Sequence, residues 1–246
     1  MKSSNATALQ PVDKQQIIVA LDVEGAEEAR FIVAELGAHV GAFKIGLQLF
    51  TSAGPGFVRE VVDSGARVFL DLKFHDIPNT VAMASVEAAR LGVWMFNIHS
   101  LGGAEMMRRT VEEVNGACER ENLERPKMIG VTVLTSSDQA TLGEIGIREE
   151  INSQVLNLAK LTAECGLDGV VASPHEVSMI RENIGDRNFL IVTPGIRPDF
   201  ATNDDQKRVM TPGEAVSAGS DFLVIGRPVT KAENRLEAVR KILGEI

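Results

Sequence analysis

The sequence is poor in cysteine, in clustered histidine and in long apolar runs. Its two cysteines, Cys118 and Cys165, follow no Cys-x-x-Cys spacing, which argues against a disulfide framework or a zinc site and favours a reducing, cytoplasmic compartment. The four histidines (39, 75, 99 and 175) show no ligand spacing, so we expect no histidine-based metal site. The first residues, MKSSNATALQPVD, lack the apolar core of a signal peptide, and no apolar run reaches the ~18 to 20 residues of a membrane span. The sequence predicts no membrane partner.

Basic residues are outnumbered as well. There are 25 lysines and arginines against 34 aspartates and glutamates, a formal net charge of -9. Such a balance argues against a nucleic-acid partner, so any basic site must be local. The chain also has no low-complexity tract and no linker rich in serine or proline. We therefore expect one domain over residues 1–246, with residues 1–15 as a poorly structured tail.

Short β-branched runs recur along the chain with helix-like stretches between them. The runs are IIVALD (17–22), AFKIG (42–46), RVFLDLK (67–73), MFNIHS (95–100), KMIGVTVL (127–134), GVVAS (169–173), FLIVTPGI (189–196) and FLVIGR (222–227). Amphipathic stretches such as AEEARFIVAEL and QVLNLAKLTAECG separate them. Near-continuous apolar strands indicate a parallel sheet, and eight strand–helix units in 246 residues predict a single-domain (β/α)8 TIM barrel. An open, doubly wound sheet is the alternative.

Polar residues gather where these strands end, which is where such barrels carry their function. They are Asp22, Lys44, Asp71, Lys73, His99, Ser100, Thr135, Ser136, Arg197 and Arg227. For His99 or Ser100 alone, a solvated strand end is the favoured interpretation. Lys44 lies inside AFKIG and is different, because burying a charge is costly unless the charge is paired.

The segment FLDLKFHDIPNT (69–80) places opposite charges together at a strand end. Alternation puts Asp71 and Lys73 on one face of the strand, and Asp76 follows on the loop before Pro78. A lysine flanked by two carboxylates keeps its proton, which disfavours Schiff-base chemistry and suits proton donation to a carbanion. Lys44 would complete an alternating network. The alternative is an internal salt-bridge cluster, but buried ion pairs are weak stabilisers.

Two arginines near the end of the chain indicate a phosphate site. GIRP (195–198) follows the seventh run and GRP (226–228) follows the eighth, where TIM barrels often bind phosphate. Between them, RPDFATNDDQKRVMTPGEA is a long polar loop and a candidate lid, with Gln206 reaching inward. A plain surface loop is the alternative.

From about Ile17 onward, the chain resembles the bacterial orotidine 5'-phosphate decarboxylases. The resemblance rests on six motifs in order: VALD, FKIG, DLKFHDIPNT, VTVLTS, VTPGIRP and VIGRPVT. DLKFHDIPNT contains the Asp-x-Lys-x-x-Asp core of that family. The resemblance implies removal of carbon dioxide from orotidine 5'-phosphate to give uridine 5'-phosphate, the last step of de novo pyrimidine biosynthesis. It also implies no metal or organic cofactor, and a homodimer with shared active sites.

The resemblance further implies roles for named positions. Lys73 would protonate C6 of the pyrimidine, and Asp71 would lie close to the departing carboxylate. Asp76 and Thr80 would reach into the partner subunit's site. The other expected substrate-binding residues are Asp22 and Lys44 for the ribose hydroxyls, Thr135 for the pyrimidine, Gln206, Gly226, Arg227 and Arg197 for the phosphate, and Ile77.

Two other functions fit parts of this pattern. Magnesium-dependent sugar-phosphate decarboxylases and synthases of the same suprafamily share the Asp-x-Lys-x-x-Asp core, but their second strand supplies a carboxylate to the metal. Here that strand carries Lys44, which would repel a cation. A catalytically silent, nucleotide-binding barrel is the other alternative. Its sign would be the loss of a charged core residue, and none is lost.

Overall fold

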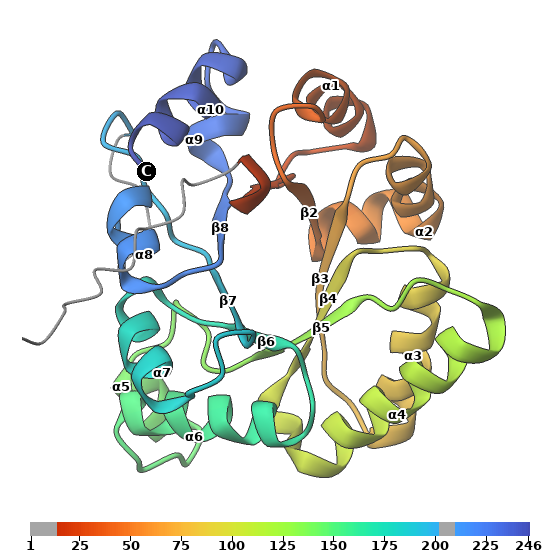
Figure 1. Ribbon diagram of the computed structural model, residues 1–246, viewed down its shortest axis with the longest axis vertical. Coiled ribbons are helices and arrows are strands. Elements are labelled where there is room, and N and C mark those ends of the chain that lie inside the picture. The colour runs from red at the N-terminus through yellow and green to blue at the C-terminus, as the bar shows by residue number, and fades with distance from the viewer. Residues whose placement is uncertain (1–13, 202–209) are drawn as a thin grey trace, which may run out of the picture.

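The computed structural model describes residues 14–201 and 210–246, and its centre is a closed barrel of eight parallel strands in chain order (Figure 1). The closed order confirms the predicted (β/α)8 barrel and rules out the open sheet. Each strand overlaps the run predicted for it. The strands are β1 (Ile17–Ala20), β2 (Ala42–Gly46), β3 (Val68–Phe74), β4 (Met95–His99), β5 (Lys127–Val131), β6 (Gly169–Val171), β7 (Leu190–Thr193) and β8 (Phe222–Ile225).

Helices surround the barrel on its outside (Figure 1). They are α1 (Ala26–Leu36), α2 (Leu47–Asp63), α3 (Pro78–Arg90), α4 (Gly103–Glu121), α5 (Gln139–Glu144), α6 (Ile151–Glu164), α7 (Val177–Asn183), α8 (Pro212–Ala218), α9 (Arg227–Thr230) and α10 (Arg235–Gly244), with short 3-10 turns η1 (Lys14–Gln16), η2 (Ser100–Gly102) and η3 (Pro174–Glu176). The turn η1 begins within residues 1–15, which were expected to form a tail, and residues 1–13 lie outside the described part. Among the described residues, no helix is both long and apolar enough to span a membrane.

The strands present two different faces, because successive side chains in a strand point in opposite directions. Inward-facing side chains form a small buried cluster that includes Ile18, Ala42, Phe69 and Met95. Outward-facing side chains such as Leu70 pack instead in the layer between the strands and the helices. Asp71 follows Leu70 and therefore faces the barrel interior, as the alternation predicted.

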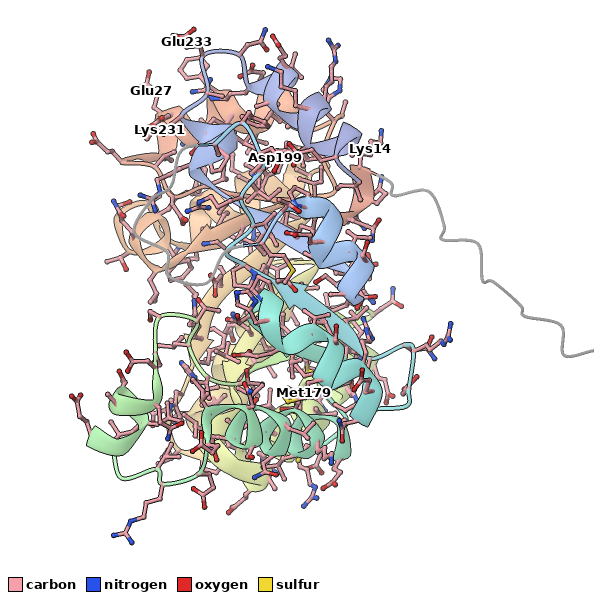
Figure 2. All side chains as sticks on the ribbon, turned by 90° about the vertical axis from the view of Figure 1, so that its left-hand side faces the viewer. Lys14, Glu27, Met179, Asp199, Lys231 and Glu233 are labelled. Carbon is pink, nitrogen blue, oxygen red and sulfur yellow. The ribbon has the colours of Figure 1, made fainter. Side chains whose placement is uncertain are left out.

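The two ends of the barrel differ. Before β4 and at the start of β8, Trp94 and Phe222 make an edge-to-face contact with their ring centroids 5.1 Å apart, and the Arg67 guanidinium lies 4.6 Å from the Trp94 ring centroid. This packing fills the amino-terminal end. In Figure 2, Lys14, just before β1, lies on one side of the molecule, and Lys231, after β8 and α9, lies on the opposite side. The carboxyl ends of the strands thus face away from the filled end.

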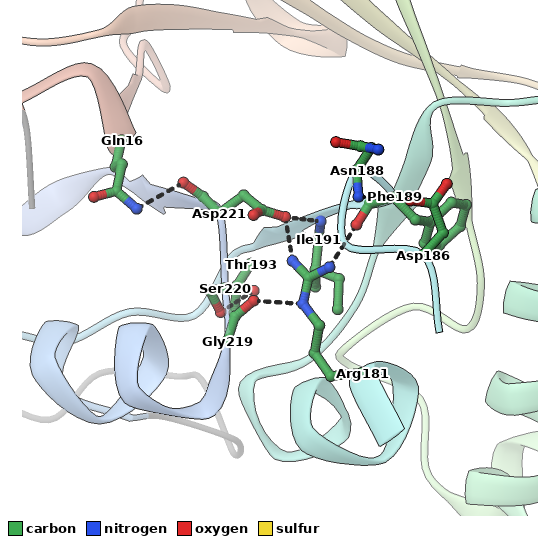
Figure 3. Close-up of polar contacts among 10 residues, drawn as sticks. All are labelled: Gln16, Arg181, Asp186, Asn188, Phe189, Ile191, Thr193, Gly219, Ser220 and Asp221. Carbon is green, nitrogen blue, oxygen red and sulfur yellow. Dashed lines mark hydrogen bonds and ion pairs between the residues drawn. The ribbon is translucent and has the colours of Figure 1, made fainter. Parts of the chain in front are cut away.

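A polar network ties α7 to β7 and β8 (Figure 3). The guanidinium of Arg181 donates to the Gly219 carbonyl at 2.8 Å, to the Phe189 carbonyl at 2.6 Å and to the Asp221 carboxylate. The same carboxylate accepts from the backbone N–H of Ile191 at 2.6 Å. Burial raises the pKa of Asp221 above its usual range, although the bonds from Ile191 and Arg181 oppose that effect.

We expect Arg181→Leu to lower the free energy of unfolding by about 2 to 3 kcal/mol, because it leaves the Asp221 carboxylate without its cation. When folding raises the pKa of a carboxyl group, the free energy of unfolding falls as the pH rises from the pKa of the unfolded state through the pKa of the folded state. Removing Arg181 raises the pKa of Asp221 further, so the loss should be larger at pH 7 than at pH 4. Urea unfolding at both pH values measures it.

The matched control is Arg109→Leu, which removes an exposed arginine that pairs with Glu113 at 2.7 Å along α4. An exposed pair of this kind contributes about 1 kcal/mol or less. Arg181→Leu could instead lower the free energy of unfolding no more than Arg109→Leu does, or by the same amount at both pH values. Either result would show that Asp221 does not depend on Arg181.

Candidate active site

A cavity of ≈ 380 Å³ opens at the carboxyl ends of the strands, the end of a TIM barrel that carries catalysis. It is lined by eight of the residues predicted from the sequence: Asp22, Lys44, Asp71, Lys73, Thr135, Arg197, Gly226 and Arg227. Lys231 also lines it and was not predicted. The structure therefore brings together residues from strands β2 and β3, from the loops after β1, β5, β7 and β8, and from the start of α9.

A larger cavity of ≈ 590 Å³ lies outside the barrel, between α2, β3 and α3. Apolar side chains such as Phe50, Leu70 and Leu91 form most of its wall, with Arg59 and Glu87 as its charged residues. Convergent polar groups mark a ligand site better than size does. The smaller cavity is therefore the candidate active site, and four of its charged side chains contact one another: Asp22, Lys44, Asp71 and Lys73.

Those four side chains form a row of alternating charge. The ammonium of Lys44 lies 3.0 Å from Asp22 Oδ1 and 3.3 Å from Asp71 Oδ2, and the ammonium of Lys73 lies 2.6 Å from Asp71 Oδ1. Exposure rises along the row in both directions, since the side chains of Lys44 and Asp71 are 11% and 12% exposed, that of Lys73 is 28% exposed and that of Asp22 is 58% exposed. The two inner charges are thus fixed by the protein, and the outer two face the opening.

The inner charges stabilise each other. Burial would raise the pKa of Asp71, but the nearby charges of Lys44 and Lys73, with hydrogen bonds from Lys73 and Asn97, hold it below the usual range. Burial would likewise lower the pKa of Lys44, but Asp71 and Asp22 raise it above the usual value. Both groups therefore stay charged at neutral pH. The row offers fixed negative charge at Asp71 and a partly exposed ammonium at Lys73.

The backbone at Lys73 is unusual. Its φ of 52° lies in the left-handed region, which residues other than glycine seldom adopt and which often marks functional sites. The pairing of β3 with β4 is irregular over the same stretch, between Leu70 and Phe74. Sequence alternation alone placed Lys73 beside Asp71, but the structure reaches that arrangement through a local irregularity.

The loops after β7 and β8 form the other end of the cavity. A backbone bridge joins Ile196 to Met210, and the N–H of Arg197 donates to the Met210 carbonyl at 3.0 Å. The two ends of the predicted lid are therefore held side by side next to the cavity. Gln206, predicted to reach inward from this loop, lies outside the described residues.

Three predicted residues do not line the cavity. Asp76, Ile77 and Thr80 are exposed at the start of α3, where the Asp76 carboxylate accepts from the N–H of Ile77 at 2.6 Å. Within the described part of this single chain, Lys73 pairs with Asp71 and forms no ion pair with Asp76. The expectation that two carboxylates of one chain flank Lys73 is therefore not met inside one subunit.

The interpretation of His99 and Ser100 as solvated strand ends is wrong. Ser100 is fully buried, with its Oγ 2.8 Å from Thr162 Oγ1. His99 is half-buried beside His75, with ring centroids 5.3 Å apart, and its burial, His75 and Lys73 lower its pKa. Both side chains pack against neighbouring elements because the chain turns directly from β4 into η2.

Comparison with known proteins assigns the family. The chain matches the orotidine 5'-phosphate decarboxylase / HUMPS family over residues 15–242. It is 54% identical over 233 residues to the orotidine 5'-phosphate decarboxylase of Geotalea daltonii, covering 95% of this chain and 96% of that protein. The crystal structure of orotidine 5'-phosphate decarboxylase from Lactobacillus acidophilus superposes with a TM-score of 0.81 at 39% identity, covering 93% of this chain and 97% of that one. An uncharacterized conserved protein from Geobacillus kaustophilus superposes with the same TM-score, 0.81, at 36% identity, covering 93% and 99%. With this coverage and identity, together with the row of charges at the mouth of its barrel, the chain belongs to the orotidine 5'-phosphate decarboxylase / HUMPS family.

Proposed function

We propose that this chain is an orotidine 5'-phosphate decarboxylase, which converts orotidine 5'-phosphate to uridine 5'-phosphate and carbon dioxide in pyrimidine biosynthesis. The observation that carries the proposal is the Lys73 ammonium held 2.6 Å from Asp71 in the cavity at the barrel mouth. The 54% identity to a protein of that name over nearly the whole chain supports the same activity. The second charged pair of the row, Asp22 with Lys44, lies beside the first.

The proposed chemistry needs one proton donor and fixed charges. As the bond between C6 and the carboxylate breaks, carbon dioxide leaves and the electron pair stays on C6. Lys73 is the partly exposed cation of the row, so it is placed to stabilise that negative charge and to donate its proton to C6. Asp71 cannot move away from the substrate carboxylate, because Lys44, Lys73 and Asn97 hold it. Its negative charge therefore favours the departure of neutral carbon dioxide over retention of the substrate carboxylate.

The rest of the cavity would bind the nucleotide. Asp22 and Lys44 would contact the ribose hydroxyls, and Thr135, from the loop after β5, would contact the pyrimidine. At the end formed by the segments after β7 and β8, Arg197, Gly226 and Arg227 would bind the phosphate. Gln206, which lies outside the described residues, would join them from the predicted lid. Two guanidinium groups suit a phosphate dianion because each offers several N–H donors in a fixed plane.

We also propose a homodimer in which each subunit completes its partner's site. Asp76, Ile77 and Thr80 support this, because they are exposed beside the cavity's strand β3 without lining the cavity of their own chain. Ile77 is 67% exposed in the single chain, so its side chain is available for contact with a partner subunit. A cytoplasmic location fits two cysteines that are buried and unpaired. We propose no nucleic-acid or membrane partner.

The test of the activity is conversion of orotidine 5'-phosphate by the purified chain after treatment with EDTA. We expect uridine 5'-phosphate to form at the same rate with and without the chelator. The position that would serve a metal in the magnesium-dependent branch of the family carries Lys44 here, and within the described residues no three histidine, cysteine or acidic side chains are placed to hold a cation. Inhibition by EDTA that magnesium reverses, with turnover of a hexulose phosphate, would instead place the chain in that branch.

A further inference from the structure

The irregular pairing of β3 with β4 has one residue at its centre. Leu70 pairs with Phe96 and Phe74 pairs with Ile98, so β3 advances four residues where β4 advances two. Asp71 and Lys73 lie inside this bulge. The residue of β4 that faces them is Asn97, which is fully buried in the barrel interior. Bulges of this kind re-aim side chains next to active sites.

The Asn97 side chain makes a hydrogen bond to each of the two paired residues, Asp71 and Lys73. Its Nδ2 donates to Asp71 Oδ1 at 2.7 Å, and its Oδ1 accepts from the backbone N–H of Lys73 at 2.8 Å. The orientation of the amide is fixed, because the reverse would place two N–H groups together and an oxygen against a carboxylate. Asp71 Oδ1 thus receives two donors, the amide of Asn97 and the ammonium of Lys73 at 2.6 Å.

We propose that Asn97 is the positioning residue of the active site, closing the β3 bulge so that Lys73 stays in its left-handed conformation with its ammonium on Asp71. The backbone N–H of Lys73 has lost its regular place in the strand ladder, and the amide oxygen of Asn97 takes the place of a backbone carbonyl. An amide is suited to this position because it offers a donor and an acceptor without charge. The expected effect on kcat rests on the proposed function, but the expected effect on the conformation of Lys73 does not.

Asn97→Leu and Asn97→Asp separate the two hydrogen bonds. The leucine has a similar size and removes both bonds. The aspartate keeps the acceptor for Lys73 but, when ionised, has no donor for Asp71. We expect Asn97→Leu to lower kcat about 100-fold, since small misplacement of a catalytic group can cost that much, with KM and the Kd of uridine 5'-phosphate changed less than about threefold.

The pH dependence of Asn97→Asp is a readout that loss of packing would not change. A proton shared between the new carboxyl group and Asp71 restores the missing donor, so kcat of this variant relative to wild type should rise as the pH falls from 8 to 5. Asn97→Leu should show no such recovery. Ser220→Ala is the matched control. Ser220 is buried, its Oγ lies 2.7 Å from Thr193 Oγ1 (Figure 3), and neither residue lines the cavity, so this variant should keep the wild-type kcat.

The crystal structure of Asn97→Leu tests the inference without any assay. We expect φ of residue 73 to leave the left-handed region and the contact between Lys73 and Asp71 to break. If Asn97→Leu does not fold, the Asn97→Asp structure and its pH profile decide the matter. An unchanged Lys73 in the variant structure, or a wild-type kcat, would overturn the inference. A wild-type chain that does not convert orotidine 5'-phosphate would overturn the proposed function, and the structure of the variant would still decide the role of Asn97.

Discussion

Lys73→Ala should lower the turnover of orotidine 5'-phosphate by at least about 100-fold. The substitution removes the proposed proton donor of the site, the ammonium that lies 2.6 Å from Asp71. General acid catalysis contributes typically 10² to 10⁴ in rate, and the cation also stabilises negative charge on C6. Arg197 and Arg227, the proposed phosphate-binding residues that line the cavity, remain, so binding of uridine 5'-phosphate should stay measurable by calorimetry.

Lys73→Arg separates charge from proton transfer. The guanidinium keeps a cation beside Asp71, but it does not release a proton in a protein, so this variant should also be inactive. Both variants need a check of folding by urea unfolding, because the alanine variant removes one of the two cations that pair with Asp71 among the described residues. A folded Lys73→Ala chain with more than about a hundredth of the wild-type rate would show that Lys73 is not the proton donor.

Mixing two inactive variants should restore activity if the subunits share their sites. Asp76 is exposed and unpaired with Lys73 in its own chain, so we expect it to act in the partner's site. In a mixed dimer of Lys73→Ala and Asp76→Ala, one site carries both lesions and the other carries neither. With statistical exchange, half of the dimers are mixed and half of their sites are intact, so activity should return to about a quarter of the wild-type value.

The control mixes Lys73→Ala with Asp71→Ala. Both residues line the cavity of one chain, so every site in that mixture keeps a lesion and no activity should return. Subunit exchange can be followed with differently tagged chains. If exchange is complete and the Asp76→Ala mixture is as inactive as the control, Asp76 serves its own chain and the shared-site arrangement is wrong.

The barrel and most of the cavity lining could be predicted because both depend on regular sequence patterns: the repeat of strand and helix along the chain, and the alternation of faces along each strand. Alternation along β3 correctly predicted that the Asp71 and Leu70 side chains point to opposite faces of the strand. The eight apolar runs correctly predicted the eight strands of a closed barrel. Most of the predicted runs extend past the ends of their strands, and two of them extend furthest. The runs 127–134 and 189–196 continue with apolar residues after β5 and β7 have ended, and after β7 the chain turns at Gly195, where φ is 81°.

The positions that sequence reasoning missed depend on contacts between strands. Asn97 lies in MFNIHS, a run that reads as an ordinary buried strand, and nothing in its spacing shows that it faces a bulge. The same holds for Ser100, whose partner Thr162 is 62 residues away in the chain. A polar residue inside an apolar strand was the available signal, and it was applied to the charged residues, above all Lys44, but not to Asn97.

The most direct measurement of the central claim is the analysis of the product formed in heavy water. Orotidine 5'-phosphate carries no hydrogen on C6, so the atom added there must come from an exchangeable donor such as the Lys73 ammonium. Proton NMR should show uridine 5'-phosphate with deuterium at C6 and the original hydrogen at C5, with one carbon dioxide released per nucleotide. Failure to form uridine 5'-phosphate, or incorporation of deuterium at C5 during turnover, would contradict direct decarboxylation with protonation at C6.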